Sequence, residues 1–223
     1  VTLMLFVATL VGTLAVAVVT GTAPDSVDEA WTYSPPGLLM TNLTLAALIP
    51  VAQLGVWGGF GWRPRWVASV GGGLRWAFLA RCYAVTLLVM ALAFAVMVAL
   101  EGGLTVKLES SAGLYALVVL LTTPLQSAGE AYFFRGWLSQ AVASWVPSAV
   151  VGAVLAAGVS ATAFSFAHGT QNLWLFADRF LFGLVASWLV WRTGGLEASI
   201  AVHGANNVLS FGLAIITGQV GDM

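Results

Sequence analysis

Long apolar runs decide what this chain can fold into. Seven stretches consist mainly of apolar residues with few charges, at approximately 1–20, 37–57, 76–100, 111–129 with a continuation, 148–167, 173–191 and 196–217. About 20 helical residues cross the roughly 30 Å of hydrocarbon in a bilayer, and each run is about that long. The runs lack the alternation that strands of a membrane β-barrel need. The sequence therefore predicts an all-α fold, a polytopic integral membrane bundle of about seven transmembrane helices.

The composition agrees with a membrane domain. Of the 223 residues, 60% are hydrophobic and only 8% are charged, whereas soluble domains carry about 25% charged residues. No internal repeat, low-complexity tract or soluble linker separates the runs, so residues 1–223 are expected to form a single membrane domain. Because no basic segment precedes the run at 1–20, we interpret it as a genuine span rather than a signal sequence.

Charge and cysteine content restrict the partners. The net charge is −1, so the chain lacks the basic surface that nucleic-acid binding needs, and no nucleic-acid partner is expected. Cys82 is the only cysteine and can form neither a disulfide within the chain nor a cysteine metal cluster. The expected partners are membrane lipid and a membrane-associated peptide or protein. Arg outnumbers Lys seven to one, and Ala, Gly and Val are abundant, which indicates a GC-rich bacterial genome and hence a multi-pass protein of the bacterial plasma membrane.

Arginines predict the orientation of the chain. Arg63, Arg65, Arg75 and Arg81 surround the connection between the second and third runs. Arginines near the ends of spans are retained on the cytoplasmic side of a membrane. This connection is therefore predicted to be cytoplasmic, and the tryptophans beside it are typical of an interfacial belt.

Ionisable residues inside the runs each need a physical reason, because insertion of a charge costs at least about 2.5 kcal/mol. They include Glu130, Arg135, His168, Asp178, Arg179 and His203, and the two histidines are the only ones in the chain. Residues five apart on an ideal α-helix differ in direction by about 140°. We therefore expect Arg135 to pair with Asp178 rather than with Glu130.

The spacing of the polar residues indicates shared helical faces. His168 lies four residues after Phe164, and Asn207 lies four residues after His203, so each pair presents one surface to the bundle interior. Together with Glu130, they would place a carboxylate, two imidazoles and an amide within hydrocarbon. Such a set is suited to activating water and stabilising an oxyanion, whereas structural packing would need only a hydroxyl or a single ion pair.

Three motifs carried by these residues resemble those of the CAAX protease and bacteriocin-processing family of intramembrane proteases. The family patterns are Glu-Glu-x-x-x-Arg followed by Gly, Phe-x-x-x-His, and His-x-x-x-Asn. The matching segments are residues 130–136, 164–168 and 203–207. Order, separation and placement near helix ends agree across roughly residues 111–217, which the resemblance marks as a catalytic core.

The resemblance implies an intramembrane endopeptidase that hydrolyses a peptide bond of a membrane-associated peptide or protein. By their positions in the motifs, Glu130 and His168 would activate the attacking water. His203 and Asn207 would stabilise the oxyanion of the tetrahedral intermediate.

Other positions would support these four catalytic residues. Arg135 and Phe164 belong to the motifs, and Asp178 is the expected counter-ion of Arg135. The sequence departs from the family at Ala131, where the family usually has a second Glu. This departure puts in question any mechanism that needs two carboxylates.

Two alternatives remain open. Two histidines and a glutamate form a recognised catalytic zinc set, so zinc is a possible cofactor with Glu130, His168 and His203 as ligands. Ala131 would then leave no second carboxylate as base, which favours the metal-free mechanism. The loss of that carboxylate also fits a non-catalytic immunity or scaffold protein of the same fold.

Membrane depth provides a structural test of the site. By simple counting, Glu130 and His203 lie toward the cytoplasmic half of the membrane, whereas His168, at the far end of its run, lies too deep to be level with them. The proposed site therefore requires a different span boundary, or tilting and kinking that bring these residues level.

Overall fold

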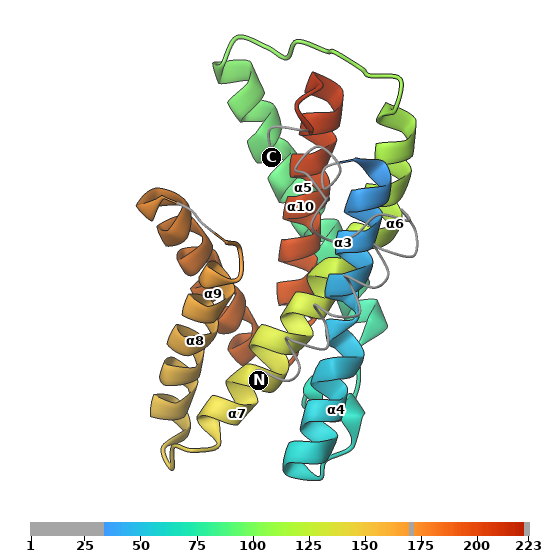
Figure 1. Ribbon diagram of the computed structural model, residues 1–223. Helices are drawn as coiled ribbons and strands as arrows, with labels where there is room; N and C mark the ends of the chain where they lie inside the picture. The colour runs from blue at the N-terminus through green and yellow to red at the C-terminus, as the bar shows by residue number, and fades with distance from the viewer. Residues whose placement is uncertain (1–33, 170–171, 221–223) are drawn as a thin grey trace. The chain divides into compact units, whose positions relative to one another are not determined.

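The computed structural model describes residues 34–169 and 172–220, which are almost entirely helical (Figure 1). The elements are α3 (Pro35–Ala46), α4 (Leu48–Phe60), η2 (Pro64–Val67), α5 (Trp76–Leu100), α6 (Ala112–Glu130), η3 (Ala131–Leu138), α7 (Ser139–Ala143), α8 (Ala149–Phe166), α9 (Leu173–Thr193) and α10 (Glu197–Thr217). An isolated antiparallel bridge joins Ser69 and Gly195. The predicted all-α fold is confirmed.

Six helical segments of the described residues are long and apolar enough to cross a membrane. They are Pro35–Phe60, Trp76–Leu100, Ala112–Ala143, Ala149–Phe166, Leu173–Thr193 and Glu197–Thr217. Each corresponds to one predicted run, and the run with a continuation reaches Ala143. The predicted span at 1–20 lies outside the described residues. These segments identify a multi-pass integral membrane protein.

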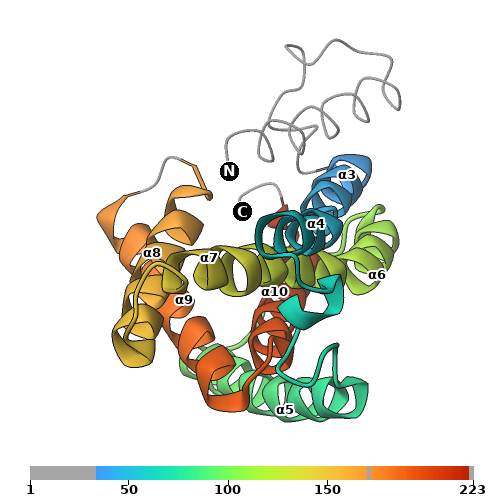
Figure 2. The ribbon, with the colours of Figure 1, turned by 90° about the horizontal axis from the view of Figure 1, so that it is seen from below.

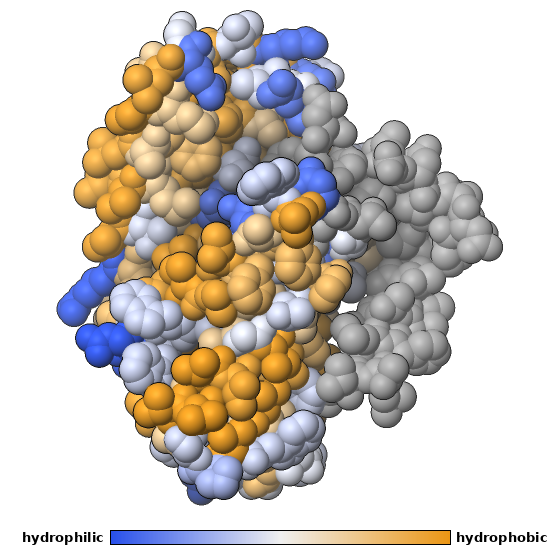
Figure 3. Space-filling model, turned by 90° about the vertical axis from the view of Figure 1, so that its left-hand side faces the viewer, coloured by the Kyte–Doolittle hydropathy of each residue, from blue (hydrophilic) through white to orange (hydrophobic). Residues whose placement is uncertain are grey.

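The surface of α5 is mostly apolar. None of its residues is buried within the protein, and Val85, Leu88 and Leu92 are among its exposed side chains. The face seen in Figure 3 likewise carries broad areas of hydrophobic side chains. Because water would not favour such continuous apolar surface, these side chains are suited to contact with lipid.

Local sequence signals explain where α8 and α9 begin and end. The Ser148 hydroxyl accepts a hydrogen bond from the backbone N–H of Val151 at 3.4 Å, which caps α8. The Asn172 side chain caps α9 in the same way, accepting from the N–H of Leu175 at 2.9 Å. Gly194 ends α9 with a φ of 67°, a left-handed conformation that glycine adopts without strain.

The described residues contribute to two compact units. Of the described residues, unit 1 contains 34–47, 84–128 and 203–220, and unit 2 contains 48–83, 129–169 and 172–202. Helices α5, α6 and α10 contribute residues to both units. The expectation of a single membrane domain over residues 1–223, with a catalytic core at 111–217, stays a prediction.

Unit 1 combines an apolar core with one buried polar contact. Its core residues, which come from α3, α6, α10 and the segment after α10, are Leu38, Val118, Val119, Ala214, Ile215 and Val220. The buried Asn42 side chain donates hydrogen bonds to the hydroxyls of Thr122 and Thr123 at 2.8 and 3.1 Å. These bonds connect α3 to α6 and satisfy an amide that would otherwise be unpaired in hydrocarbon.

Unit 2 is built around η3, which packs against α4, α7 and α8, while α8 packs against α9 (Figures 1 and 2). Glycines allow some of these elements to approach closely. A Cβ atom on Gly183 of α9 would lie only 2.9 Å from the Cα atom of Ala161 in α8. A Cβ atom on Gly136 of η3 would lie 2.7 Å from the Val67 side chain in η2. Larger residues at these two positions would push the elements apart.

A buried ion pair connects the segment before α5 to the start of α10 within unit 2. Arg75 Nη2 and Nε donate to the two carboxylate oxygens of Glu197 at 2.7 and 3.0 Å, and the Arg75 backbone N–H donates at 2.8 Å. The Glu197 side chain is 0% exposed, whereas that of Arg75 is 37% exposed. The hydrogen bond to Glu197 raises the pKa of Arg75 above its ordinary value, so the pair stays charged.

Arg75→Ala is expected to destabilise the protein, because it leaves the buried Glu197 carboxylate without its counter-ion. Such a loss costs about 3–5 kcal/mol for a fully buried pair, and less here because Arg75 is partly exposed. The midpoint of thermal unfolding in detergent should fall clearly below that of the wild type. Arg81→Ala, which removes an exposed arginine of α5, is the control. Equal midpoints for the two variants would contradict a structural role for the pair.

Candidate active site

The first motif lies where α6 passes into the π-helical segment η3. Glu130 is the last residue of α6, and η3 spans Ala131–Leu138. The backbone carbonyl of Phe134 accepts hydrogen bonds from the hydroxyls of Ser139 and Ser160 at 2.9 and 2.8 Å. These two hydroxyls therefore satisfy a backbone carbonyl of the π-helical segment. Single π-helical turns occur frequently at functional sites, because they change the direction in which side chains point.

Arg135 occupies the interior of unit 2. Its side chain is 3% exposed, and its guanidinium carbon lies 4.0 Å from the centroid of the Phe164 ring. Glu130 attracts the Arg135 charge electrostatically. None of the three guanidinium nitrogens has a hydrogen-bond partner among the described residues. The main direct contact of this cation is therefore the face of an aromatic ring.

The predicted pairing of Arg135 with Asp178 is wrong. The Arg135 nitrogens make no hydrogen bond to a carboxylate, and Asp178 is exposed on α9. The prediction assumed an ideal α-helix, in which residues five apart point in different directions. Because η3 is π-helical, this angle does not apply beyond Glu130. The supporting role assigned to Asp178 stays a prediction without this contact.

Phe164 connects Arg135 to His168. The Phe164 ring meets the Phe134 ring edge to face at a centroid distance of 5.6 Å and the His168 ring at 4.5 Å. His168 Nδ1 lies 2.8 Å from the backbone carbonyl oxygen of Phe164. A carbonyl can only accept a hydrogen bond, so Nδ1 carries the proton. In the neutral imidazole, Nε2 then keeps its lone pair and can act as a base.

Glu130 and His168 lie at similar depth. The turn at residues 144–148 joins α7 to α8, and these two helices pack together, so the chain reverses direction there. The contact between Phe134 and Phe164 fixes the register of the two antiparallel segments. Glu130 lies four residues before Phe134, and His168 lies four residues after Phe164. Both therefore lie about one turn beyond this contact in the same direction.

The expectation from simple counting, that His168 lies too deep to be level with Glu130, is therefore corrected. The reason is the length of the span that contains Glu130. Counting took this run to end near residue 129, whereas the helical segment continues to Ala143. Glu130 consequently lies well inside the span rather than at its end.

The third motif belongs to unit 1. His203 is buried, and Asn207 is partly buried. The Asn207 amide donates a hydrogen bond to Gln126 Oε1 at 3.2 Å, and its own side-chain oxygen accepts from Asn206 at 3.3 Å. The structure thus brings Arg135, Phe164 and His168 into contact within unit 2, and surrounds Asn207 with amides in unit 1.

Sequence reasoning missed Gln126. This residue is 7% exposed, and its side-chain oxygen also accepts a hydrogen bond from Ser127 at 3.1 Å. It orients the amide of Asn207, which the third motif assigns to the oxyanion. A signal was present, because Gln126 lies in an apolar run four residues before Glu130. A polar side chain at that spacing in a span indicates a shared face.

The surroundings of His168 favour its neutral form. Partial desolvation lowers the pKa of His168, and the positive charges of Arg179 and Arg135 lower it further, while the hydrogen bond to the Phe164 carbonyl opposes this shift. The pKa accordingly lies below its ordinary value of about 6.5. His168 is therefore neutral at neutral pH, in the protonation state that a general base needs.

The described side chains do not form a site for a metal ion. There, no three His, Cys, Asp or Glu side chains are grouped so that they could hold one. Of the predicted zinc ligands, Glu130 and His168 belong to unit 2 and His203 to unit 1. The metalloprotease alternative is therefore not supported by the described side chains, and it stays a prediction.

Comparison with known proteins confirms the resemblance seen in the motifs. The family model described as "Type II CAAX prenyl endopeptidase Rce1-like" matches residues 111–209. "Uncharacterized protein YyaK" of Bacillus subtilis (strain 168) is 29% identical over 92 residues, which are 40% of this chain and 30% of that relative. This chain thus matches less than one third of the relative's length. No solved structure matches the chain.

Arg179→Gln is expected to raise the pKa of His168, because it removes a nearby positive charge that disfavours the imidazolium. Histidine-selective NMR in detergent can measure this pKa, since the chain has two histidines and His203→Gln identifies the second signal. Arg192→Gln is the matched control, because Arg192 lies on the same helix about 20 Å further along. A wild-type pKa above 6.5 would contradict the described surroundings of His168.

Proposed function

We propose that this chain is an intramembrane endopeptidase that hydrolyses a peptide bond of a membrane-associated peptide or protein. The match to the Rce1-like family over residues 111–209 and the six apolar helices support a membrane protease of this general kind. The observation that carries the proposal is the orientation of His168. Its Nδ1 is held by the Phe164 carbonyl at 2.8 Å, so Nε2 is available to accept a hydrogen bond from a water molecule at about the depth of Glu130.

In the proposed reaction, Glu130 and His168 activate one water molecule. A proton passes from the water to the Glu130 carboxylate, while His168 Nε2 orients the water. The water oxygen then forms a bond to the carbonyl carbon of the substrate, and the carbonyl oxygen takes the negative charge. When the C–N bond breaks, the proton passes from Glu130 to the departing amine. General acid–base catalysis of this kind contributes about 10²–10⁴-fold.

The third motif would supply the donors for the oxyanion. Asn207 Nδ2 is an N–H donor that is already oriented by Gln126 Oε1 at 3.2 Å. The buried His203 can donate through a ring N–H. Donors of fixed direction stabilise the developing charge, because they need no reorganisation during the reaction. This assignment follows from the family motif.

A mechanism with one carboxylate fits the surroundings of Ala131. This residue is 0% exposed, so a longer, charged side chain at this position would have to be accommodated inside the packed unit. Glu130 remains as the acid and base of the motif. The proposal therefore does not need the second carboxylate that the family usually has, and the scaffold alternative becomes one outcome of the following test.

Glu130→Gln is expected to abolish cleavage while leaving the fold intact, because it removes the base and keeps the size of the side chain. The loss should be about 10²-fold or more. Purified protein in proteoliposomes would be incubated with a library of membrane peptides, and the products would be identified by mass spectrometry. Glu109→Gln is the control, since Glu109 lies in the exposed connection before α6.

A chelator separates the mechanisms in the same experiment. Cleavage that survives chelation but is lost in Glu130→Gln would support the Glu130 and His168 mechanism. Cleavage lost in both conditions would favour the zinc alternative. If the folded wild-type protein cleaves no peptide under any condition, the hypothesis of a non-catalytic scaffold protein replaces the proposed hydrolase function.

A further inference from the structure

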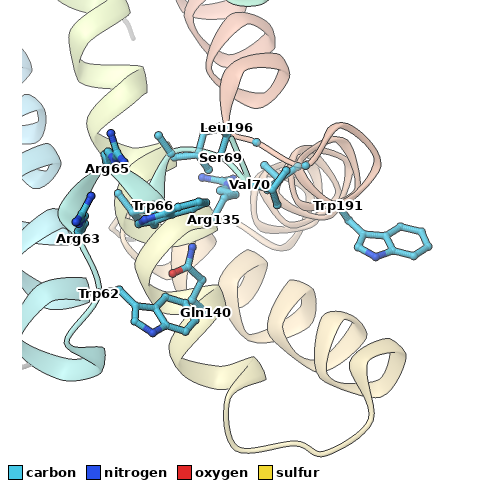
Figure 4. Close-up of a pocket in the computed structure, with 15 residues that line it drawn as sticks. Trp62, Arg63, Arg65, Trp66, Ser69, Val70, Arg135, Gln140, Trp191 and Leu196 are labelled. Carbon is cyan, nitrogen blue, oxygen red and sulfur yellow. The ribbon is translucent and has the colours of Figure 1, made fainter. Parts of the chain in front are cut away.

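Unit 2 contains a cavity of about 780 Å³ that no step of the proposed hydrolysis uses. The segment around η2, the end of α9 and the connection from α9 to α10 line it, together with Arg135 and Gln140 (Figure 4). Its volume is within the range of about 300–1,000 Å³ that is typical of ligand sites in proteins. Much of the wall is apolar, and Val67 and Leu196 contribute to it. A ligand of this cavity would therefore need an apolar part.

Arg135 gives the cavity an unsatisfied cation. The side chain is only 3% exposed, and its Nε, Nη1 and Nη2 atoms have no hydrogen-bond partner in the described ranges. The guanidinium face is covered by the Phe164 ring at 4.0 Å, so the N–H groups at its edge are the donors that remain. An anion with two acceptor oxygens matches this edge.

The other polar groups of the cavity suit an anion as well. Arg63 and Arg65 are exposed residues of its lining, and no Asp or Glu is among its lining residues. Gln140 also lines the cavity, and the NH₂ group of its side-chain amide can donate hydrogen bonds. The lining thus combines three arginines with no acidic side chain.

The residues that line the cavity indicate that it lies at the edge of the bilayer. Trp62 and Trp66 lie beside the arginines (Figure 4) in the connection between the spans Pro35–Phe60 and Trp76–Leu100. The connection from α9 to α10, which also lines the cavity, falls on the same side when the spans alternate. Tryptophans and arginines at span ends are typical of headgroup depth.

We propose that this cavity binds the phosphate headgroup of an anionic phospholipid. Arg135 would be the buried donor to the phosphate oxygens, and Arg63 and Arg65 would attract the headgroup at the entrance. The apolar wall and the two tryptophans would contact the start of the acyl chains. The observations favour a lipid over a soluble phosphate, because the apolar wall would gain nothing from a small, fully polar ion.

Native mass spectrometry of the full chain in detergent tests this site by direct binding. Phosphatidylglycerol and phosphatidylcholine would be titrated separately, and the first is expected to bind more tightly and to raise the midpoint of thermal unfolding more. Arg135→Gln is expected to weaken binding of phosphatidylglycerol about tenfold to a hundredfold. The exposed variants Arg63→Gln and Arg65→Gln should each weaken it about fivefold. Arg81→Gln, outside the lining, should not change it.

The exposed variants Arg63→Gln and Arg65→Gln keep the proposal testable if Arg135→Gln does not fold. Equal binding of the two lipids, or equal effects of Arg63→Gln and Arg81→Gln, would overturn the proposal. Competition with glycerol 3-phosphate distinguishes the source of the phosphate. If this soluble phosphate displaces the lipid at similar concentrations, the site binds free phosphate esters and the lipid assignment is wrong. Binding is measured without turnover, so these outcomes are independent of the proposed hydrolysis.

Discussion

Hydrocarbon offers no water to a polar group, so each polar group inside the spans must find a partner within the protein or in a ligand. This constraint explains most of the specific contacts in the structure. Asn42 bonds to two threonine hydroxyls in unit 1, and Glu197 bonds to Arg75 in unit 2. The Asn207 amide bonds to Gln126. Apolar packing alone distinguishes poorly between helix partners in lipid, and these contacts select particular pairs of elements.

The same constraint explains why the candidate catalytic groups of unit 2 hold defined orientations. The Phe134 carbonyl in the π-helical segment accepts hydrogen bonds from two serine hydroxyls. These bonds stabilise an irregular turn inside the membrane span. Phe164 then packs against Phe134, Arg135 and His168 at the same time. A change at Phe164 would therefore alter both the buried cation and the imidazole. This shared contact gives a physical reason for a phenylalanine in the second motif.

The sequence predicted those features that depend on local pattern. Apolar runs predicted six of the helices, because the length needed to cross a bilayer leaves little choice, and the three motifs predicted the resemblance that the Rce1-like family model matches over residues 111–209. Features that depend on tertiary contacts were not predictable. The π-helical turn changed the expected direction of Arg135, so the pairing with Asp178 was wrong. Gln126 was missed because no motif includes it, although its spacing from Glu130 was informative.

Ala131, where the sequence departs from the family motif, also explains why the Arg135 side chain lacks a hydrogen-bonded carboxylate. The family pattern places a second carboxylate four residues before the arginine, about one helical turn away. This chain has a fully buried methyl group there, so the family's second negative charge is absent, and Glu130 is the carboxylate that attracts Arg135. The guanidinium keeps N–H donors without a partner among the described residues. One substitution thus leaves Glu130 as the single carboxylate of the motif, and also leaves the cavity beside Arg135 suited to an anion from outside the chain.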